Sequence, residues 1–160
     1  MPHMRHESHV QETSFHAGGK GYNALRALKV GEVVSPLTGR IRVGAPTVYS
    51  VQVSRDEHLD PENLHFLNHS CVPNTFLDTE ASHVIAIRPI AEGEPLSFFY
   101  PSTEWEMGNP FPCACGATAC LGTITGASAL PAVVLEGYAL NAHIRELLAE
   151  RDATGALVRD

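Results

Sequence analysis

The four cysteines constrain the fold of this chain more than any other feature. Cys113, Cys115 and Cys120 lie in one Cys-x-Cys-x4-Cys cluster, and Cys71 lies far earlier in the chain. Four thiolates suffice for a closed tetrahedral zinc site, and a Cys-x-Cys pair can chelate a metal on a turn. The alternative is that four buried thiols pack as small hydrophobic groups. Because alanine and glycine surround the cluster and offer little apolar bulk, we expect a structural zinc ion held by all four.

Short apolar stretches bounded by proline and glycine fill the chain up to Tyr100, which predicts small curled β-sheets rather than a helix bundle. Residues 47–53 alternate between apolar and polar side chains, as in a half-buried strand. Residues 101–122 show little periodicity, so a metal ion would supply order there. From residue 132 to residue 150 the period becomes helical. We therefore expect one mostly β domain of 160 residues with a carboxy-terminal α-helix.

Charge and hydropathy argue against several classes of protein. The chain carries 11 basic and 18 acidic residues, a formal net charge of −7, which argues against direct nucleic-acid binding. No apolar run is long enough to cross a membrane. The polar, histidine-rich start of the chain lacks the apolar region of a secretory signal. We therefore expect an intracellular, cytoplasmic protein, in which disulfides are disfavoured and metal binding explains the cysteines better.

The start of the chain carries several histidines among polar residues, namely His3, His6, His9 and His16. Histidines at every third position could hold a metal on a folded helix. A loose, solvated tail is the simpler interpretation, because the segment has no apolar face to bury. We expect a flexible tail over residues 1–17.

Four motifs in a fixed order point to a known family. Residues 68–74 read Asn-His-Ser-Cys-Val-Pro-Asn, which on its own is also consistent with a plain turn. Gly-Lys-Gly-Tyr-Asn-Ala precedes it at residues 19–24, and Ile-Ala-Glu-Gly-Glu at residues 90–94 runs on to Tyr100. The cysteine cluster comes last. Together these motifs resemble those of SET-domain methyltransferases with a post-SET zinc motif. Lysine is rare while arginine and alanine are plentiful, a composition that indicates a GC-rich genome. We therefore expect a small bacterial member of the family.

The resemblance implies the SET fold, in which small curled β-sheets surround a pseudoknot. The segment of Tyr100 would then thread beside the segment of Asn68 and His69. After the tail, we expect a SET domain at residues 18–109, a post-SET zinc motif at residues 110–125 and a helical extension at residues 126–160.

The cofactor that the resemblance implies is S-adenosylmethionine. By motif position, its methionine part would lie against Lys20, Gly21 and Tyr22, and its adenosine part against Asn68 and His69. Glycine suits such a role because it permits close approach of a ligand to the backbone. Phe111, just before the cysteine cluster, would cover the adenine, or would simply be a core aromatic residue.

Tyr100 is the catalytic candidate, because its position matches the catalytic tyrosine of the family. A tyrosine at the end of an apolar strand is otherwise a core residue with a satisfied hydroxyl. Methyl transfer needs a neutral, aligned nucleophile, and orientation alone can contribute about 7–11 kcal/mol. A lysine amine starts with a pKa of about 10.4, which an apolar channel and the positive sulfur would lower. Tyr49, Phe98 and Trp105 are further candidates for the channel wall, with plain packing as the alternative.

Two departures from the family pattern leave the substrate open. Pro95 and Phe99 stand where acidic residues are usual, and only a short insert separates Tyr49 from Asn63. The first hypothesis is a monomeric protein-lysine N-methyltransferase acting on a protein or peptide. The short insert motivates a second, an enzyme that methylates a small molecule. The two substitutions motivate a third, a binding module without turnover.

Overall fold

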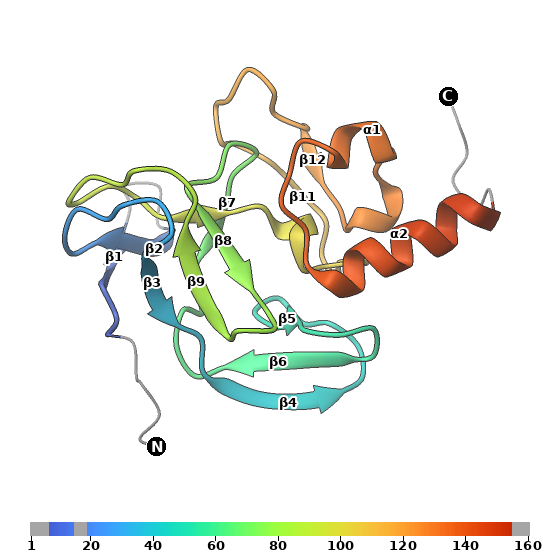
Figure 1. Ribbon diagram of the computed structural model, residues 1–160, viewed down its shortest axis with the longest axis horizontal. Coiled ribbons are helices and arrows are strands. Elements are labelled where there is room, and N and C mark those ends of the chain that lie inside the picture. Colours follow the sequence, from blue (N-terminus) through green and yellow to red (C-terminus); the bar gives the residue numbers. More distant parts are fainter. Residues whose placement is uncertain (1–6, 15–18, 155–160) are drawn as a thin grey trace.

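The computed structural model describes residues 7–14 and 19–154, and short strands make up most of its regular structure (Figure 1). The strands are β1 (Val10–Ser14), β2 (Lys20–Ala24), β3 (Val33–Pro36), β4 (Gly39–Val43), β5 (Val51–Gln52), β6 (Glu57–Pro61), β7 (Asn68–His69), β8 (Thr75–Asp78), β9 (His83–Ala86), β10 (Ser97–Phe98), β11 (Phe111–Pro112) and β12 (Thr123–Ile124). The helices are the 3-10 turns η1 (Tyr100–Ser102) and η2 (Ala127–Ala129), and α1 (Ala132–Leu135) and α2 (Ala142–Thr154). The predicted mostly β fold with a carboxy-terminal helix is confirmed.

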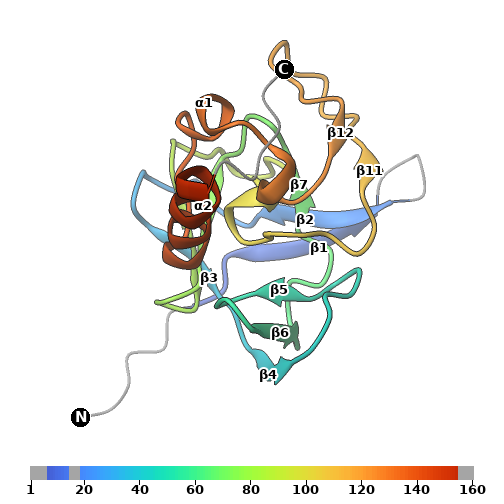
Figure 2. The same ribbon diagram turned by 90° about the vertical axis from the view of Figure 1, so that its right-hand side faces the viewer.

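The strands form several small antiparallel sheets. Two of these are three-stranded, with the orders β3-β9-β8 and β4-β6-β5, and two are the pairs β1-β2 and β11-β12. Both views place the β4-β6-β5 sheet at one end of the molecule, and β11, β12 and α1 at the other (Figures 1 and 2). Within residues 7–14 and 19–154, no helix is both long and apolar enough to cross a bilayer.

The pairing of β7 with β10 is parallel and joins two segments far apart in sequence. Ser97 lies opposite Asn68, and Phe98 lies opposite His69. Asn74, which is 1% exposed, holds the two segments together. Its amide donates to Glu94 Oε2 at 2.8 Å and to the Pro95 carbonyl at 2.9 Å, while its oxygen accepts from the backbone N–H of Ser97 at 2.9 Å. The predicted threading of the Tyr100 segment beside Asn68 and His69 is therefore confirmed.

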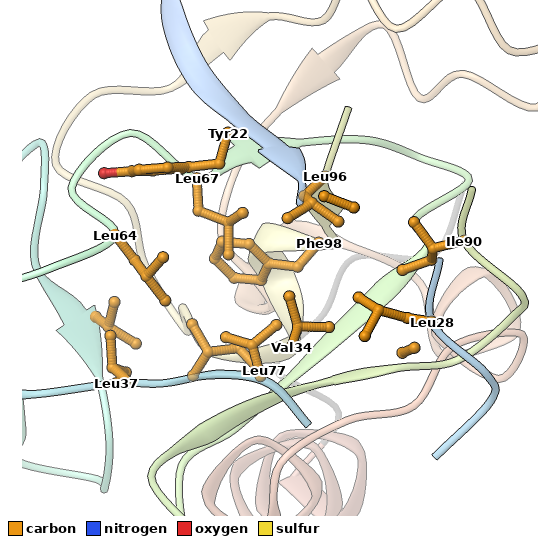
Figure 3. Close-up of a cluster of buried hydrophobic side chains, with 14 of the residues drawn as sticks. Tyr22, Leu28, Val34, Leu37, Leu64, Leu67, Leu77, Ile90, Leu96 and Phe98 are labelled. Carbon is orange, nitrogen blue, oxygen red and sulfur yellow. The ribbon is translucent and has the colours of Figure 1, made fainter. Parts of the chain in front are cut away.

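The main core lies between the β3-β9-β8 sheet and the segments around it. Side chains from β2, β3, β8 and β10 point into the same space in Figure 3. Alternate residues of β8 and β9 are buried, as expected for strands with one covered face, and Leu77 and Val84 are each 1% exposed. A second cluster joins the helices to the segment after β10, through Phe99, Leu135 and Ile144.

Successive residues of an extended strand point to opposite faces. Phe98 accordingly enters the main core, whereas Phe99 enters the second cluster. Tyr100 follows directly and packs against the main core. Tyr100, the predicted catalytic residue, therefore lies where the two hydrophobic clusters meet.

The prediction of a loose tail is wrong for the described part of residues 1–17. Residues 10–14 form β1, which pairs antiparallel with β2 along its full length, and the backbone N–H of His9 donates to the Val34 carbonyl. Pairing satisfies the backbone N–H and C=O groups of both strands, so β1 forms although its sequence is polar. His9 contacts Arg26, and the other three histidines of this segment lie outside the described residues.

Two other predicted segments are shorter than expected. The strand expected over residues 47–53 covers only Val51–Gln52, because Thr47 and Ser50 form a turn. The Ser50 hydroxyl accepts from the Thr47 N–H, and the Thr47 hydroxyl accepts from the Ser50 N–H. The helix expected over residues 132–150 is divided into α1 and α2. Asn141 lies at the break, and its buried amide donates to the Leu77 and Ser102 carbonyls.

Candidate active site and zinc centre

The four cysteines converge, as the sequence predicted. Their sulfur atoms all lie within 4.8 Å of one another, and those of Cys71 and Cys113 are 3.9 Å apart. Thiolates bound to one zinc ion lie about 2.3 Å from the metal and so about 3.8 Å from each other. The spacing of the four sulfur atoms therefore fits tetrahedral coordination of one zinc ion.

Local backbone geometry brings the cysteine cluster onto a compact loop. Gly116 and Gly122 have φ values of +74° and +81°, a region that favours glycine because it has no Cβ. The Cys113 N–H donates to the Gly122 carbonyl, and the Leu121 N–H donates to the Cys71 sulfur at 3.3 Å. Burial raises the pKa of the Cys71 thiol, whereas backbone hydrogen bonds lower the pKa of Cys115. Four cysteine ligands leave a metal no open position, so the centre suits a structural ion.

A cavity of about 340 Å³ extends to Phe111, just before the cysteine loop. Four of the residues predicted to form the site line it, namely Lys20, Asn68, Tyr100 and Phe111. The Asn68 amide donates to the Lys20 carbonyl at 3.0 Å, so the first and the central motif meet at the cavity wall. The ring centroids of Phe111 and Tyr100 are 5.9 Å apart. The structure thus brings residues from three distant motifs to one cavity.

Tyr100 is held at this cavity by two hydrogen bonds. Its hydroxyl donates to the Leu67 carbonyl at 2.6 Å, and its backbone N–H donates to His69 Nδ1 at 3.1 Å. Burial, together with the nearby Glu104 carboxylate, raises the pKa of Tyr100 above its usual value of 10.0. The phenol therefore stays protonated at neutral pH, which suits it to orient a group rather than to act as a base.

Gly21, Tyr22 and His69 do not line the cavity. Gly21 and Tyr22 are buried in β2, and Tyr22 belongs to the main core. His69 connects Tyr100 to the cysteine cluster, because its Nδ1 accepts from the Tyr100 N–H and its Nε2 lies 3.4 Å from the Cys71 sulfur. Burial lowers the pKa of His69 to about 4, so its ring is neutral at physiological pH. The cofactor roles of these three residues stay predictions.

Phe99, one of the two departures from the family pattern, has a packing role. Its ring stacks on that of Tyr138, with centroids 3.6 Å apart and an interplanar angle of 2°. The Tyr138 hydroxyl donates to the Cys71 carbonyl at 2.6 Å. An acidic side chain at this position, which is 2% exposed, would be buried without water, so phenylalanine suits the environment that α1 creates.

The other aromatic candidates differ in their surroundings. Tyr49 and Phe98 both line the cavity. Tyr49 is 52% exposed and contacts the edge of Phe66, with centroids 5.7 Å apart, so it lies near the cavity mouth. Phe98 is buried in the main core. Trp105 packs in the second cluster and does not line the cavity.

Glu104 is a cavity residue that sequence reasoning missed. It is 7% exposed and lines the cavity together with Tyr100. Its carboxylate accepts from the backbone N–H of Gln52 at 2.9 Å and from the Thr103 hydroxyl at 2.7 Å. Burial raises the pKa of Glu104 to about 7. A single acid four residues after Tyr100 gives no sequence signal, because only the fold shows that it is buried.

Comparison with known families agrees with this geometry. Residues 5–101 match the SET domain, and the chain belongs to this family of methyltransferases. The chain is 37% identical to "Methyltransferase flvH" of Aspergillus flavus, over 98% of this chain and 92% of that protein. It is also 31% identical to "Histone-lysine N-methyltransferase, H3 lysine-36 specific" of Chaetomium globosum, over 70% of this chain but only 15% of that protein.

Solved structures share the fold at low sequence identity. A crystal structure of KRYPTONITE in complex with mCHG DNA and SAH superimposes with a TM-score of 0.63, at 20% identity over 75% of this chain and 30% of that one. The methyltransferase domain of human SETMAR gives a TM-score of 0.57, at 21% identity over 72% of this chain and 57% of that one. Methyltransferases of the SET family use S-adenosylmethionine.

Proposed function

We propose that this protein transfers a methyl group from S-adenosylmethionine to the side-chain amine of lysine in a protein or peptide. The observation that carries the proposal is that one cavity is lined by Tyr100, Asn68 and Lys20, in a chain whose four thiols form a cluster of zinc-like geometry. Relatives named histone-lysine N-methyltransferases support a lysine substrate. We further propose that the metal is zinc and that its role is structural.

In this proposal Lys20, Asn68 and Phe111 hold the cofactor, which supplies a methyl group on a positively charged sulfur. The residues of the chain then bind and orient the amine. Tyr100 lies at the cavity wall, and the other side chains that line the cavity are mostly apolar. An apolar surrounding lowers the pKa of an amine, because it disfavours the charged form. The apolar part of the cavity wall therefore favours the neutral nucleophile that methyl transfer needs.

A small-molecule amine is the second candidate substrate. The segment between β5 and β7 contains only the strand β6 and its flanking turns, so little chain is available there to build a peptide groove. The A. flavus relative matches this chain over 92% of its own length, and it is named only as a methyltransferase, without a substrate. Mass spectrometry on small amines and on peptides, incubated separately with the cofactor, distinguishes the two candidates.

Tyr100→Phe tests the proposed function. We expect labelled methyl transfer to fall by about 100-fold, because the group that orients the amine is lost. Tyr138→Phe is the matched control. It removes the hydroxyl of another tyrosine, which is partly buried, donates to the Cys71 carbonyl and does not line this cavity. Scintillation counting on peptide libraries and lysates gives the rate, and thermal melting checks that both variants fold. Tight cofactor binding without transfer to any amine would contradict the proposal and indicate a binding module.

A further inference from the structure

Glu104 is the only acidic side chain among the described residues that line the cavity. The cavity wall is otherwise mainly apolar and aromatic, and its one lysine, Lys20, places its ammonium over the Phe66 ring, 5.1 Å from the centroid. Within the described part of the chain, no ion pair joins Glu104 to a basic residue. A buried carboxylate is thus available at this cavity without a cationic partner.

The two carboxylate oxygens of Glu104 have different surroundings. Oε2 accepts both hydrogen bonds, from the Gln52 N–H and the Thr103 hydroxyl. Oε1 accepts none from the residues that the structure describes, and it is not among the buried polar atoms that lack a partner there. Since Glu104 lines the cavity and Oε2 is already bonded, Oε1 is the oxygen left free to bind a ligand there.

The backbone around Glu104 is fixed on two sides. The Ala127 N–H donates to the Glu104 carbonyl at 2.9 Å, and the Trp105 N–H donates to Gln52 Oε1 at 2.8 Å. Gly126 packs so closely that a Cβ on it would lie 2.1 Å from the Trp105 carbonyl oxygen. These contacts hold Glu104 in place whether or not a ligand is bound.

A purely structural role does not account for an acid at this position. The amide oxygen of a glutamine could accept the same two hydrogen bonds, without the free-energy cost of burying a charge. That cost is visible in the pKa of Glu104, which burial raises to about 7. Buried charges are normally paired, so a carboxylate with one oxygen facing a cavity is suited to a cationic ligand.

The titratable groups packed against Glu104 do not supply this positive charge, and His65, which also lines the cavity, packs against the rings of Tyr49 and Phe66. Tyr100, in the turn just before it, has a raised pKa and stays neutral. His143 of α2 bonds to the Thr103 carbonyl, and His58 lies opposite Gln52 on β6. Burial lowers the pKa of both histidines, so both are mainly neutral at pH 7.

We propose that Glu104 binds the ammonium group of the substrate and accepts its proton before methyl transfer. The step breaks one N–H bond of the ammonium and forms one O–H bond on Glu104, which leaves a neutral amine with its lone pair free. The proton passes to solvent when the product leaves. This inference rests on the proposed function and deepens it, because it makes a protonated amine, rather than an alcohol or thiol, the substrate class that the cavity selects.

Binding is tested without turnover, by nuclear magnetic resonance titration of 1-pentylammonium and of uncharged 1-pentanol. The protein is first saturated with S-adenosylhomocysteine, or used without it if that ligand does not bind. We expect wild type to prefer the ammonium, and Glu104→Gln to weaken ammonium binding at least tenfold while leaving pentanol unchanged. Glu150→Gln is the matched control, because it removes an exposed carboxylate that pairs with Arg55 away from the cavity. Equal ammonium binding by wild type and Glu104→Gln, or no preference of wild type for the ammonium, would overturn the inference.

The pH dependence of methyl transfer gives a second readout. We expect kcat/KM of wild type to rise with pH around 7, as Glu104 ionises. In Glu104→Gln this rise should move towards the amine's own pKa of about 10.4, with a loss of about 100-fold at pH 7. The KM for S-adenosylmethionine should not change. A profile identical to that of wild type would contradict a role for Glu104, whereas failure of wild type to methylate any amine would refute the proposed function instead.

Discussion

Burial shifts the pKa of two residues that line the cavity, Tyr100 and Glu104, and of His69 beside Tyr100. It keeps the Tyr100 phenol protonated and the His69 imidazole neutral, and it brings the pKa of Glu104 to about 7. The first two residues are therefore fixed in one form at physiological pH, as a hydrogen-bond donor and an acceptor. Glu104 alone can change its charge within that range, which makes it the residue whose state pH controls.

Glu104→Gln should also change the stability of the free protein. Because the folded protein holds the Glu104 proton to a higher pH than the unfolded chain, the free energy of unfolding falls as pH rises from about 4.5 to about 7. The difference between these pKa values corresponds to on the order of 3 kcal/mol as an upper bound. We expect Glu104→Gln to be more stable than wild type at pH 8 and similar to it below pH 4.5.

Urea unfolding at both pH values measures this difference. Glu150→Gln is again the control, because Arg55 lowers the pKa of Glu150, so stability does not fall with rising pH through this residue. A Glu104→Gln variant that is less stable than wild type at pH 8 would show that the carboxylate is needed for packing.

Specialised residues at fixed spacing were predictable from sequence, whereas buried polar contacts were not. The four cysteines could be assigned to one cluster because thiols so placed have few other uses. The Glu104 carboxylate accepts a hydrogen bond from Gln52, 52 positions earlier in the chain, so no local sequence pattern reveals that Glu104 is buried. Asn74 was recognised only as part of a motif, although its amide joins two segments of the fold.

The cysteine loop is the segment whose order should depend most on metal. Residues 113–122 contain no strand or helix, so a bound metal ion would supply the order that a hydrophobic core supplies elsewhere in the protein. We expect Cys120→Ser to lose the metal, lower the melting temperature and disorder β11 and β12. The β3-β9-β8 sheet should persist, because its side chains belong to the main core.

Elemental analysis and amide hydrogen exchange measure these effects. Thr118→Ala, an exposed substitution in the same loop, is the control and should keep one metal ion per chain. Retention of a full equivalent of zinc by Cys120→Ser, with unchanged exchange of β11 and β12, would show that the loop is ordered by packing alone.

The strand and helix boundaries show where local sequence patterns mislead. β1 is polar, and it forms because β2 offers it a row of backbone partners. The helical period after residue 131 continues through a break that is set by Asn141 and its contacts with Leu77 and Ser102. In both cases a contact outside the segment itself decides the outcome, and a periodicity analysis contains no information on it.

For the protein as a whole, the formal net charge of −7 predicts weak interaction with nucleic acid. We expect no retardation of a duplex DNA oligonucleotide in a gel-shift assay at micromolar protein and physiological salt. A basic DNA-binding protein run in parallel confirms that the assay detects binding. A retarded band that weakens as salt is added would contradict this prediction and indicate a local basic surface.

The parallel pairing of β10 with β7 has a consequence for biosynthesis. A ribosome releases the chain from its amino end, so the strands up to β9 emerge before residues 97–100 do. β10 can therefore pair with β7 only once residues 97–98 have been synthesised, after all three strands of the β3-β9-β8 sheet. A nascent chain that stops short of residue 97 carries those three strands but lacks β10 and the phenol of Tyr100, so competence for chemistry requires synthesis past this point.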